Sequence, residues 1–69
     1  MPITVDETTD LGALVGRTFR TDTFEDPFTL LSADQVPALT AIGYTARDVS
    51  LGYPFVAFLP WGKALTEVS

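Results

Sequence analysis

The residues of this chain that could carry out acid–base or metal chemistry are mainly carboxylates, because the sequence has neither histidine nor cysteine. The tightest group is Asp22, Glu25 and Asp26. An EF-hand calcium loop needs oxygen ligands at alternating positions, a central glycine and a glutamate at its end, and this spacing is absent. A catalytic carboxylate pair needs a cleft that raises one pKa, and a chain of 69 residues has little room for a cleft. We therefore predict no metal, no cofactor and no catalytic residue.

The serines and the glycines also lack the motifs of a catalytic or phosphate-binding site. Neither Ser32 nor Ser50 lies in the Gly-x-Ser-x-Gly turn that activates a nucleophilic serine. The glycines are scattered and form no phosphate-binding loop. These patterns predict that the protein is not an enzyme.

The charge of the chain limits its partners. The net charge is −5 and the pI is about 4.1, whereas nucleic acids and anionic membranes attract basic surfaces. Arg17 and Arg20 are close in sequence, but on a strand they would face opposite sides. We expect no nucleic acid and no membrane as partner. An alternative use of the acids is inhibition, in which they would block a basic groove of a nucleic-acid enzyme.

Hydropathy predicts where the protein is found. The apolar stretch at residues 53–61 is shorter than the ~20 apolar residues of a membrane-spanning helix. The first six residues show no basic region and no long apolar stretch, so we expect no signal peptide. The expected location is the cytoplasm or the inside of a soluble particle such as a virion.

That apolar stretch is also the most informative part of the chain. If it is a strand, Phe55, Ala57 and Leu59 point to one side, and Val56 and Phe58 point to the other. A chain this short has one small core and buries one face of a strand. The second face must then be covered by residues 37–42 of a predicted short helix or by another molecule. We favour contact with a partner.

Aromatic residues are concentrated in the last third of the chain. Tyrosine and tryptophan are enriched at protein–protein interfaces because they bury a large area and keep a polar tip. Trp61 follows Pro60 in a predicted turn, where it either contacts a partner or folds back over the core. The predicted partner-binding residues are Tyr53, Val56, Phe58, Pro60 and Trp61.

Thr- and Phe-rich segments, separated by turn residues, predict a mainly β protein with one short helix, an α+β fold. We expect an N-terminal arm at residues 1–10 and a single small β-rich domain at residues 11–69. The expected short helix begins at Ser32, which can cap it, or at Asp34, and it runs to Ile42, since Val36, Leu39 and Ile42 recur at helical spacing. Residues 25–27 read as a turn. The expected strands are residues 17–24, 28–31, 44–49, 55–59 and 63–68. They suit an SH3-like, partly open barrel or a curled antiparallel sheet.

Stability gives the last argument. A domain of this size is marginal on its own and is usually reinforced by disulfides, a metal or assembly. Disulfides are excluded here, because the chain has no cysteine. We therefore expect a homo-oligomer or a subunit of a large complex. The preferred function is a non-enzymatic structural subunit, for example a capsid-decorating or connector component of a virion. The small acidic inhibitor is the alternative.

Overall fold

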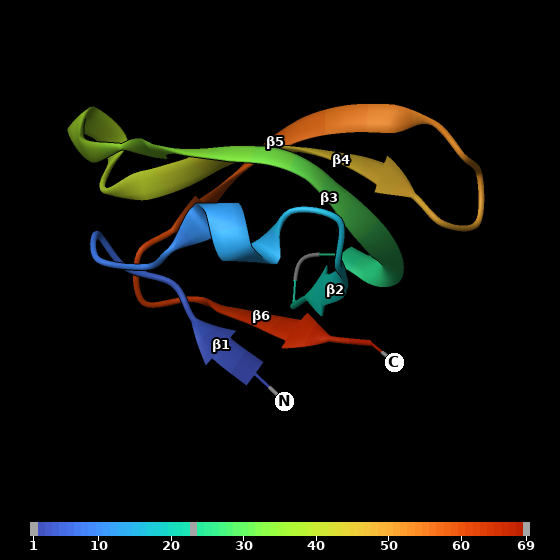
Figure 1. The fold of residues 1–69 in the computed structure, drawn as a ribbon, viewed down its shortest axis with the longest axis horizontal. Helices are drawn as coiled ribbons and strands as arrows, with labels where there is room; N and C mark the ends of the chain where they lie inside the picture. Colours follow the sequence, from blue (N-terminus) through green and yellow to red (C-terminus); the bar gives the residue numbers. More distant parts are fainter. Residues whose placement is uncertain (1, 23, 69) are drawn as a thin grey trace.

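The computed structural model describes residues 2–22 and 24–68 and consists of one six-stranded antiparallel sheet that curls on itself. The strand order is β1-β6-β2-β3-β4-β5, so β1 and β5 are the two edges. Figure 1 shows β1, β6 and β2 below, with β4 and β5 above. The elements are β1 Pro2–Thr4, η1 Leu11–Leu14, β2 Thr18–Thr21, β3 Phe24–Val36, η2 Pro37–Leu39, β4 Ala41–Asp48, β5 Pro54–Pro60 and β6 Ala64–Glu67.

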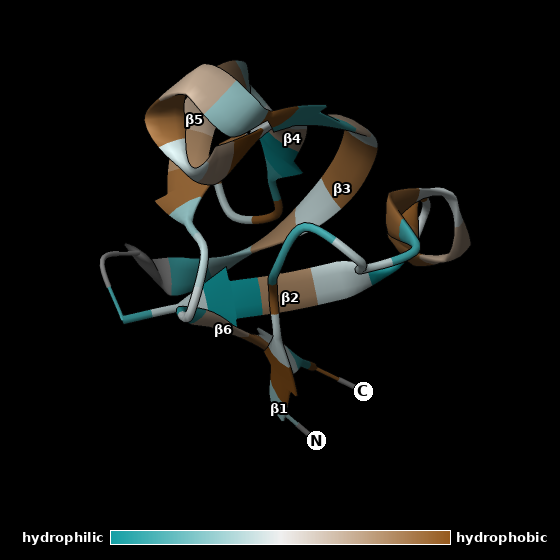
Figure 2. Cartoon of the chain, turned by 90° about the vertical axis from the view of Figure 1, so that its left-hand side faces the viewer, coloured by the Kyte–Doolittle hydropathy of each residue, from teal (hydrophilic) through white to brown (hydrophobic). Residues whose placement is uncertain are grey.

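The long strand β3 produces the curl. Its first half pairs with β2, and from Phe28 onward it pairs with β4. The register between β3 and β4 shifts between Leu30 and Ser32, which leaves Leu31 as an extra residue. Such a bulge bends a strand and increases its twist. The strand therefore passes from the lower layer to the upper one, as Figures 1 and 2 both show.

The core lies between the two layers and is filled by alternate residues of the strands. Phe28 stacks on Tyr44 with ring centroids 5.4 Å apart, and Phe55 meets Phe28 edge-on at 5.7 Å. Burial of the Tyr44 ring raises the pKa of its hydroxyl. The buried cluster comprises Val5, Leu11, Leu14, Phe19, Phe28, Leu30, Ile42, Tyr44, Ala46, Leu59 and Leu65.

Two side-chain contacts hold segments near the two ends of the chain against the rest of the sheet. Arg17, just before β2, donates from Nε to Oε2 of Glu67 in β6 at 2.8 Å, and its Nη2 reaches the other carboxylate oxygen. Gln35 in β3 donates to the carbonyl of Asp6 at 2.8 Å. The segment that follows β1 is thereby held against the sheet.

The predicted fold is confirmed as a curled antiparallel sheet, but the helix at residues 34–42 is wrong. Asp34 and Val36 belong to β3 and pair with Gly43 and Ala41, and only Pro37–Leu39 forms a single 3-10 turn. Pairing across the hairpin satisfies the backbone that a helix would have used, and Pro37 supplies no N–H. The turn predicted at residues 25–27 is also wrong, because β3 runs through it.

Candidate docking surface

The outer face of β5, formed by the side chains of Pro54, Val56, Phe58 and Pro60, is exposed. Val56 is 71% exposed and Phe58 is 57% exposed. Leu59, which points to the other face, is buried. The alternation expected from the sequence is therefore present. Tyr53, which precedes the strand, is 71% exposed. The turn at Pro37–Leu39 does not cover this face, so the structure excludes the covering helix.

Phe58 is held in place by the strand beside it. It lies opposite Gly43 in β4, and an added Cβ at Gly43 would come within 3.2 Å of Phe58 Cε1 and 3.3 Å of Val36 Cγ2. The ring thus fills the space that a side chain at position 43 would occupy. One side of the ring packs on the sheet, and the other is turned to solvent.

The apolar character is strongest at the edge of the sheet. Val56 lies opposite Thr45, and Thr45 lies opposite Ser32 on β3. In the next row Phe58 and Gly43 are followed by Asp34. In Figure 2 brown segments are seen on β3, β4 and β5, while the end of β2 is teal. A partner that docks here would meet apolar side chains at β5 and polar ones further in.

The backbone of β5 is open on one side. At one end of the β4–β5 pair, the backbone N–H of Trp61 donates to the carbonyl oxygen of Thr40 at 2.9 Å. At the other end, the backbone N–H of Asp48 donates to the carbonyl oxygen of Tyr53 at 3.0 Å. Because the backbone groups of an antiparallel strand point alternately to either side, Phe55, Ala57 and Leu59 bond to β4. The N–H and C=O groups of Val56 and Phe58 therefore point away from β4. No other described strand pairs with this side of β5.

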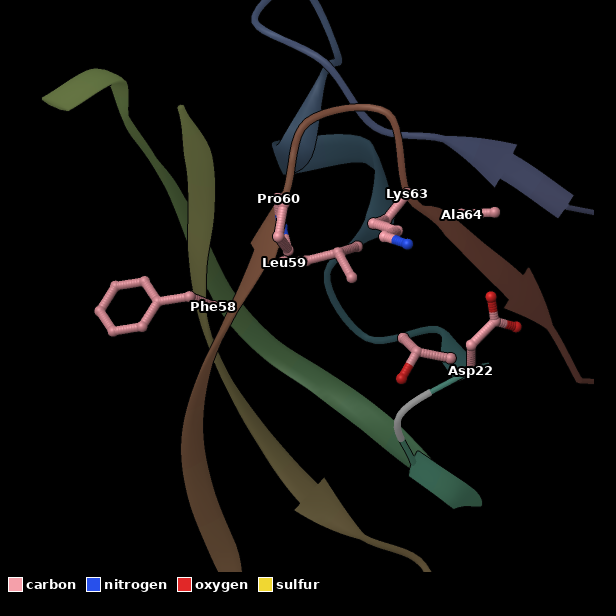
Figure 3. A pocket seen from close by; sticks show the side chains of 7 residues that line it. Asp22, Phe58, Leu59, Pro60, Lys63 and Ala64 are labelled. Atoms are coloured by element: carbon pink, nitrogen blue, oxygen red, sulfur yellow. The ribbon is translucent and has the colours of Figure 1, made fainter. Parts of the chain in front are cut away.

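A cavity of about 140 Å³ lies beside this open edge. Figure 3 shows Leu59 pointing into it and the ring of Phe58 pointing away, so Phe58 borders the cavity with its backbone. Asp22 and Lys63, of opposite charge, stand on its other side. The full lining is Thr21, Asp22, Phe58, Leu59, Pro60, Lys63 and Ala64.

Trp61, which follows Pro60, differs from the exposed residues of β5 in its packing. It is half-buried, packs against the core cluster, and donates from Nε1 to Gln35 Oε1 at 2.9 Å. Most of its surface therefore belongs to the fold itself. Val56, Phe58 and Pro60 share the outer face of β5, Tyr53 precedes the strand, and Trp61 begins the turn that leads to β6.

Two components of this surface were missed in the sequence: the open main-chain edge and the cavity beside it. Both depend on which strands are neighbours. One signal was present, since Pro60 follows Pro54 by six positions, an even offset, so the two share one side of the strand. Proline has no N–H and occurs in sheets mainly on edge strands, so this spacing indicates an edge.

The outer face of β5 presents apolar side chains and no charge. Residues 49–62 carry no charged side chain. Among residues 2–22 and 24–68, no three carboxylates come together as a metal site. In the same part of the chain, no helix has the length and apolar character needed to cross a membrane. This surface can bind another polypeptide through apolar contacts and main-chain hydrogen bonds.

Comparisons with protein-family models, with curated proteins and with solved structures gave no match to this chain.

Proposed function

We propose that this protein is a non-enzymatic structural subunit that docks on a larger protein assembly through the outer face of β5. The observation that carries the proposal is the exposure of Val56 and Phe58, each more than half exposed, on an uncharged edge strand of a very small chain. Tyr53, just before this strand, is also more than half exposed. Contiguous apolar surface of this kind is typical of interaction sites. Full burial of an exposed valine or phenylalanine side chain contributes about 1.5–3 kcal/mol. Val56 and Phe58 keep more than half of their exposure in the free chain, and burying this remainder gives docking its driving force.

A virion component, capsid-decorating or connecting, is one concrete form of such a subunit. A small chain without disulfides gains stability when it is held on a large, repetitive particle. The corresponding location is the cytoplasm during assembly and the particle afterwards. Docking on a particle in this way requires a complementary shape and apolar area, and it requires no catalytic residue.

The test is sedimentation of the tagged protein in an extract of the cells that produce it. The wild-type chain is expected to sediment with a large particle. The double variant Val56→Thr/Phe58→Thr is expected to remain at the top of the gradient, while its circular dichroism shows that it is folded. Val15→Thr is the matched control, because Val15 is 44% exposed and lies outside β5.

Two outcomes would count against the proposal. A wild-type chain that sediments as a free monomer would contradict it, and so would a double variant that sediments with the particle. High salt separates it from the acidic-inhibitor hypothesis. An interface formed by acids is weakened by salt, whereas an apolar interface persists.

A further inference from the structure

The open edge of β5 lies beside the cavity, and docking through the outer face of β5 involves neither of them. The edge presents the N–H and C=O groups of Val56 and Phe58. The cavity is bordered by the backbone of Phe58 and by the side chain of Leu59. In strand addition, main-chain hydrogen bonds of the edge supply affinity, and pockets for alternate side chains supply specificity.

We propose that an extended, uncharged segment of the partner adds to β5 as a further strand and places one apolar side chain in the cavity beside Leu59. This inference rests on the proposed function, since it names the element of the partner that docks. Residues directly opposite one another in a sheet share a face. A residue of the added strand opposite Phe58 would lie beside the exposed ring, and the residue opposite Leu59 would enter the cavity.

The size of the cavity fits one side chain. Its volume is about 140 Å³, and an engineered apolar cavity of about 150 Å³ accommodates benzene. A leucine, valine or phenylalanine side chain is therefore of suitable size. Pro54 and Pro60 offer no N–H at either end of the edge, which limits the pairing to the short stretch between them.

Charge matching specifies the segment further. A charged residue opposite Val56 or Phe58 would lose water without meeting a counter-charge, because residues 49–62 are uncharged. Asp22 and Lys63 at the cavity have opposite signs and favour neither charge. The edge is thus complementary to a neutral strand.

A second copy of this chain fits the edge less well. If its own β5 were the added strand, the inward side chains would have to fill the cavity, but Phe55 is already packed against Phe28 and Tyr44. Each copy also carries a net charge of −5, which opposes the approach of two copies. These contacts and charges favour a segment of a different protein.

The test is backbone amide hydrogen exchange of the full chain, measured by NMR with a blocked synthetic peptide as long as β5. The probe peptide alternates threonine with valine and has leucine at its centre, and the control peptide has aspartate in place of that leucine. In the free chain the amides of Val56 and Phe58 should exchange rapidly, while those of Ala57 and Leu59 are protected by β4. With the probe peptide at about ten times its dissociation constant, exchange at Val56 and Phe58 should slow about tenfold. The control peptide should have no such effect.

The remaining outcomes overturn the inference in distinguishable ways. Unchanged exchange at Val56 and Phe58 with the probe peptide, or equal protection by both peptides, contradicts strand addition with a filled cavity. Protection that develops with the concentration of the chain alone identifies a second copy as the occupant. If strand addition fails while Val56→Thr/Phe58→Thr still releases the chain from its assembly, the proposed function stands without it. If that variant stays on the assembly, the proposed function fails whatever the peptide does.

Discussion

The ring of Phe58 lies over Gly43, its cross-strand partner in β4. An added Cβ at Gly43 would come within 3.2 Å of Phe58 Cε1, closer than an ordinary van der Waals contact. Glycine in the interior of a strand often marks a close approach, and an aromatic side chain of the neighbouring strand here covers it. The same contact positions the exposed side of the ring for a partner.

Replacing this glycine tests the contact. Gly43→Ala should displace the ring of Phe58 and leave the free energy of unfolding within about 1 kcal/mol of wild type. Alanine restricts the unfolded chain, and this gain offsets the local shift of Phe58 and Val36. Gly43 has no positive φ, so its backbone admits alanine. Urea unfolding gives the stability, and the ring signals of Phe58 in NMR report the displacement. Unmoved ring signals would contradict the contact.

Two phenylalanines that differ in exposure should differ in their contribution to stability. Phe28 is fully buried, and Phe28→Ala should cost about 3–5 kcal/mol. Phe58 is 57% exposed, and Phe58→Ala should cost less than about 1.5 kcal/mol while weakening association with the assembly. Thermal or urea unfolding of the two variants makes the comparison. Equal losses would mean that the ring of Phe58 is part of the core.

The side chain of Gln35 connects two segments that are distant in sequence. It accepts a hydrogen bond from Trp61 Nε1 at 2.9 Å and donates one to the carbonyl of Asp6 at 2.8 Å. Gln35→Met keeps the length of the side chain and removes both bonds, so it should destabilise the fold by about 1–2 kcal/mol. Gln35→Glu retains the acceptor for Trp61 and should cost less. The fluorescence of Trp61, the single tryptophan, follows unfolding in urea. An unchanged midpoint for Gln35→Met would contradict this connection.

The stability of the fold should fall in acid because of Glu67. The hydrogen bond from Arg17 lowers the pKa of the Glu67 carboxyl below its ordinary 4.5, and the attraction of the two charges adds to this. A carboxyl whose pKa is lower in the folded state stabilises the fold above the unfolded value, and this contribution is lost as the pH falls through the folded value. Glu67→Gln should therefore reduce the dependence of the unfolding free energy on pH below about 4.5. Identical pH profiles for variant and wild type would contradict the assignment.

Asp6 should contribute to the same acid range. Its pKa is lowered first by the hydrogen bond from the Thr8 hydroxyl, at 2.6 Å, and then by the backbone N–H of Thr8. Thr8→Val removes the hydroxyl donor and should bring the pKa of Asp6 closer to its ordinary 3.8. NMR titration of the Asp6 carboxyl measures this shift directly. A pKa that remains unchanged in Thr8→Val would show that the hydroxyl is not its cause.

Local sequence patterns predict the strand β5 correctly, but they do not predict the full length of β3. The period of two at Phe55–Leu59 correctly assigns the inward and outward side chains, because each depends only on the geometry of an extended strand. Val36, Leu39 and Ile42 repeat at helical spacing, yet the first and last belong to strands that pair with each other. That pairing joins residues across a hairpin, and it outweighs the local preference. The open edge and the cavity follow from strand order, which no single segment encodes.

Photo-crosslinking at Phe58 tests the central claim most directly. A photoreactive benzoylphenylalanine in place of Phe58, in cells that produce the protein, should form a covalent product with another protein of the assembly. The same group in place of Arg20, which is exposed on β2, should form none. A chain that remains an uncrosslinked monomer when labelled at Phe58 would contradict the claim that the outer face of β5 is a docking surface.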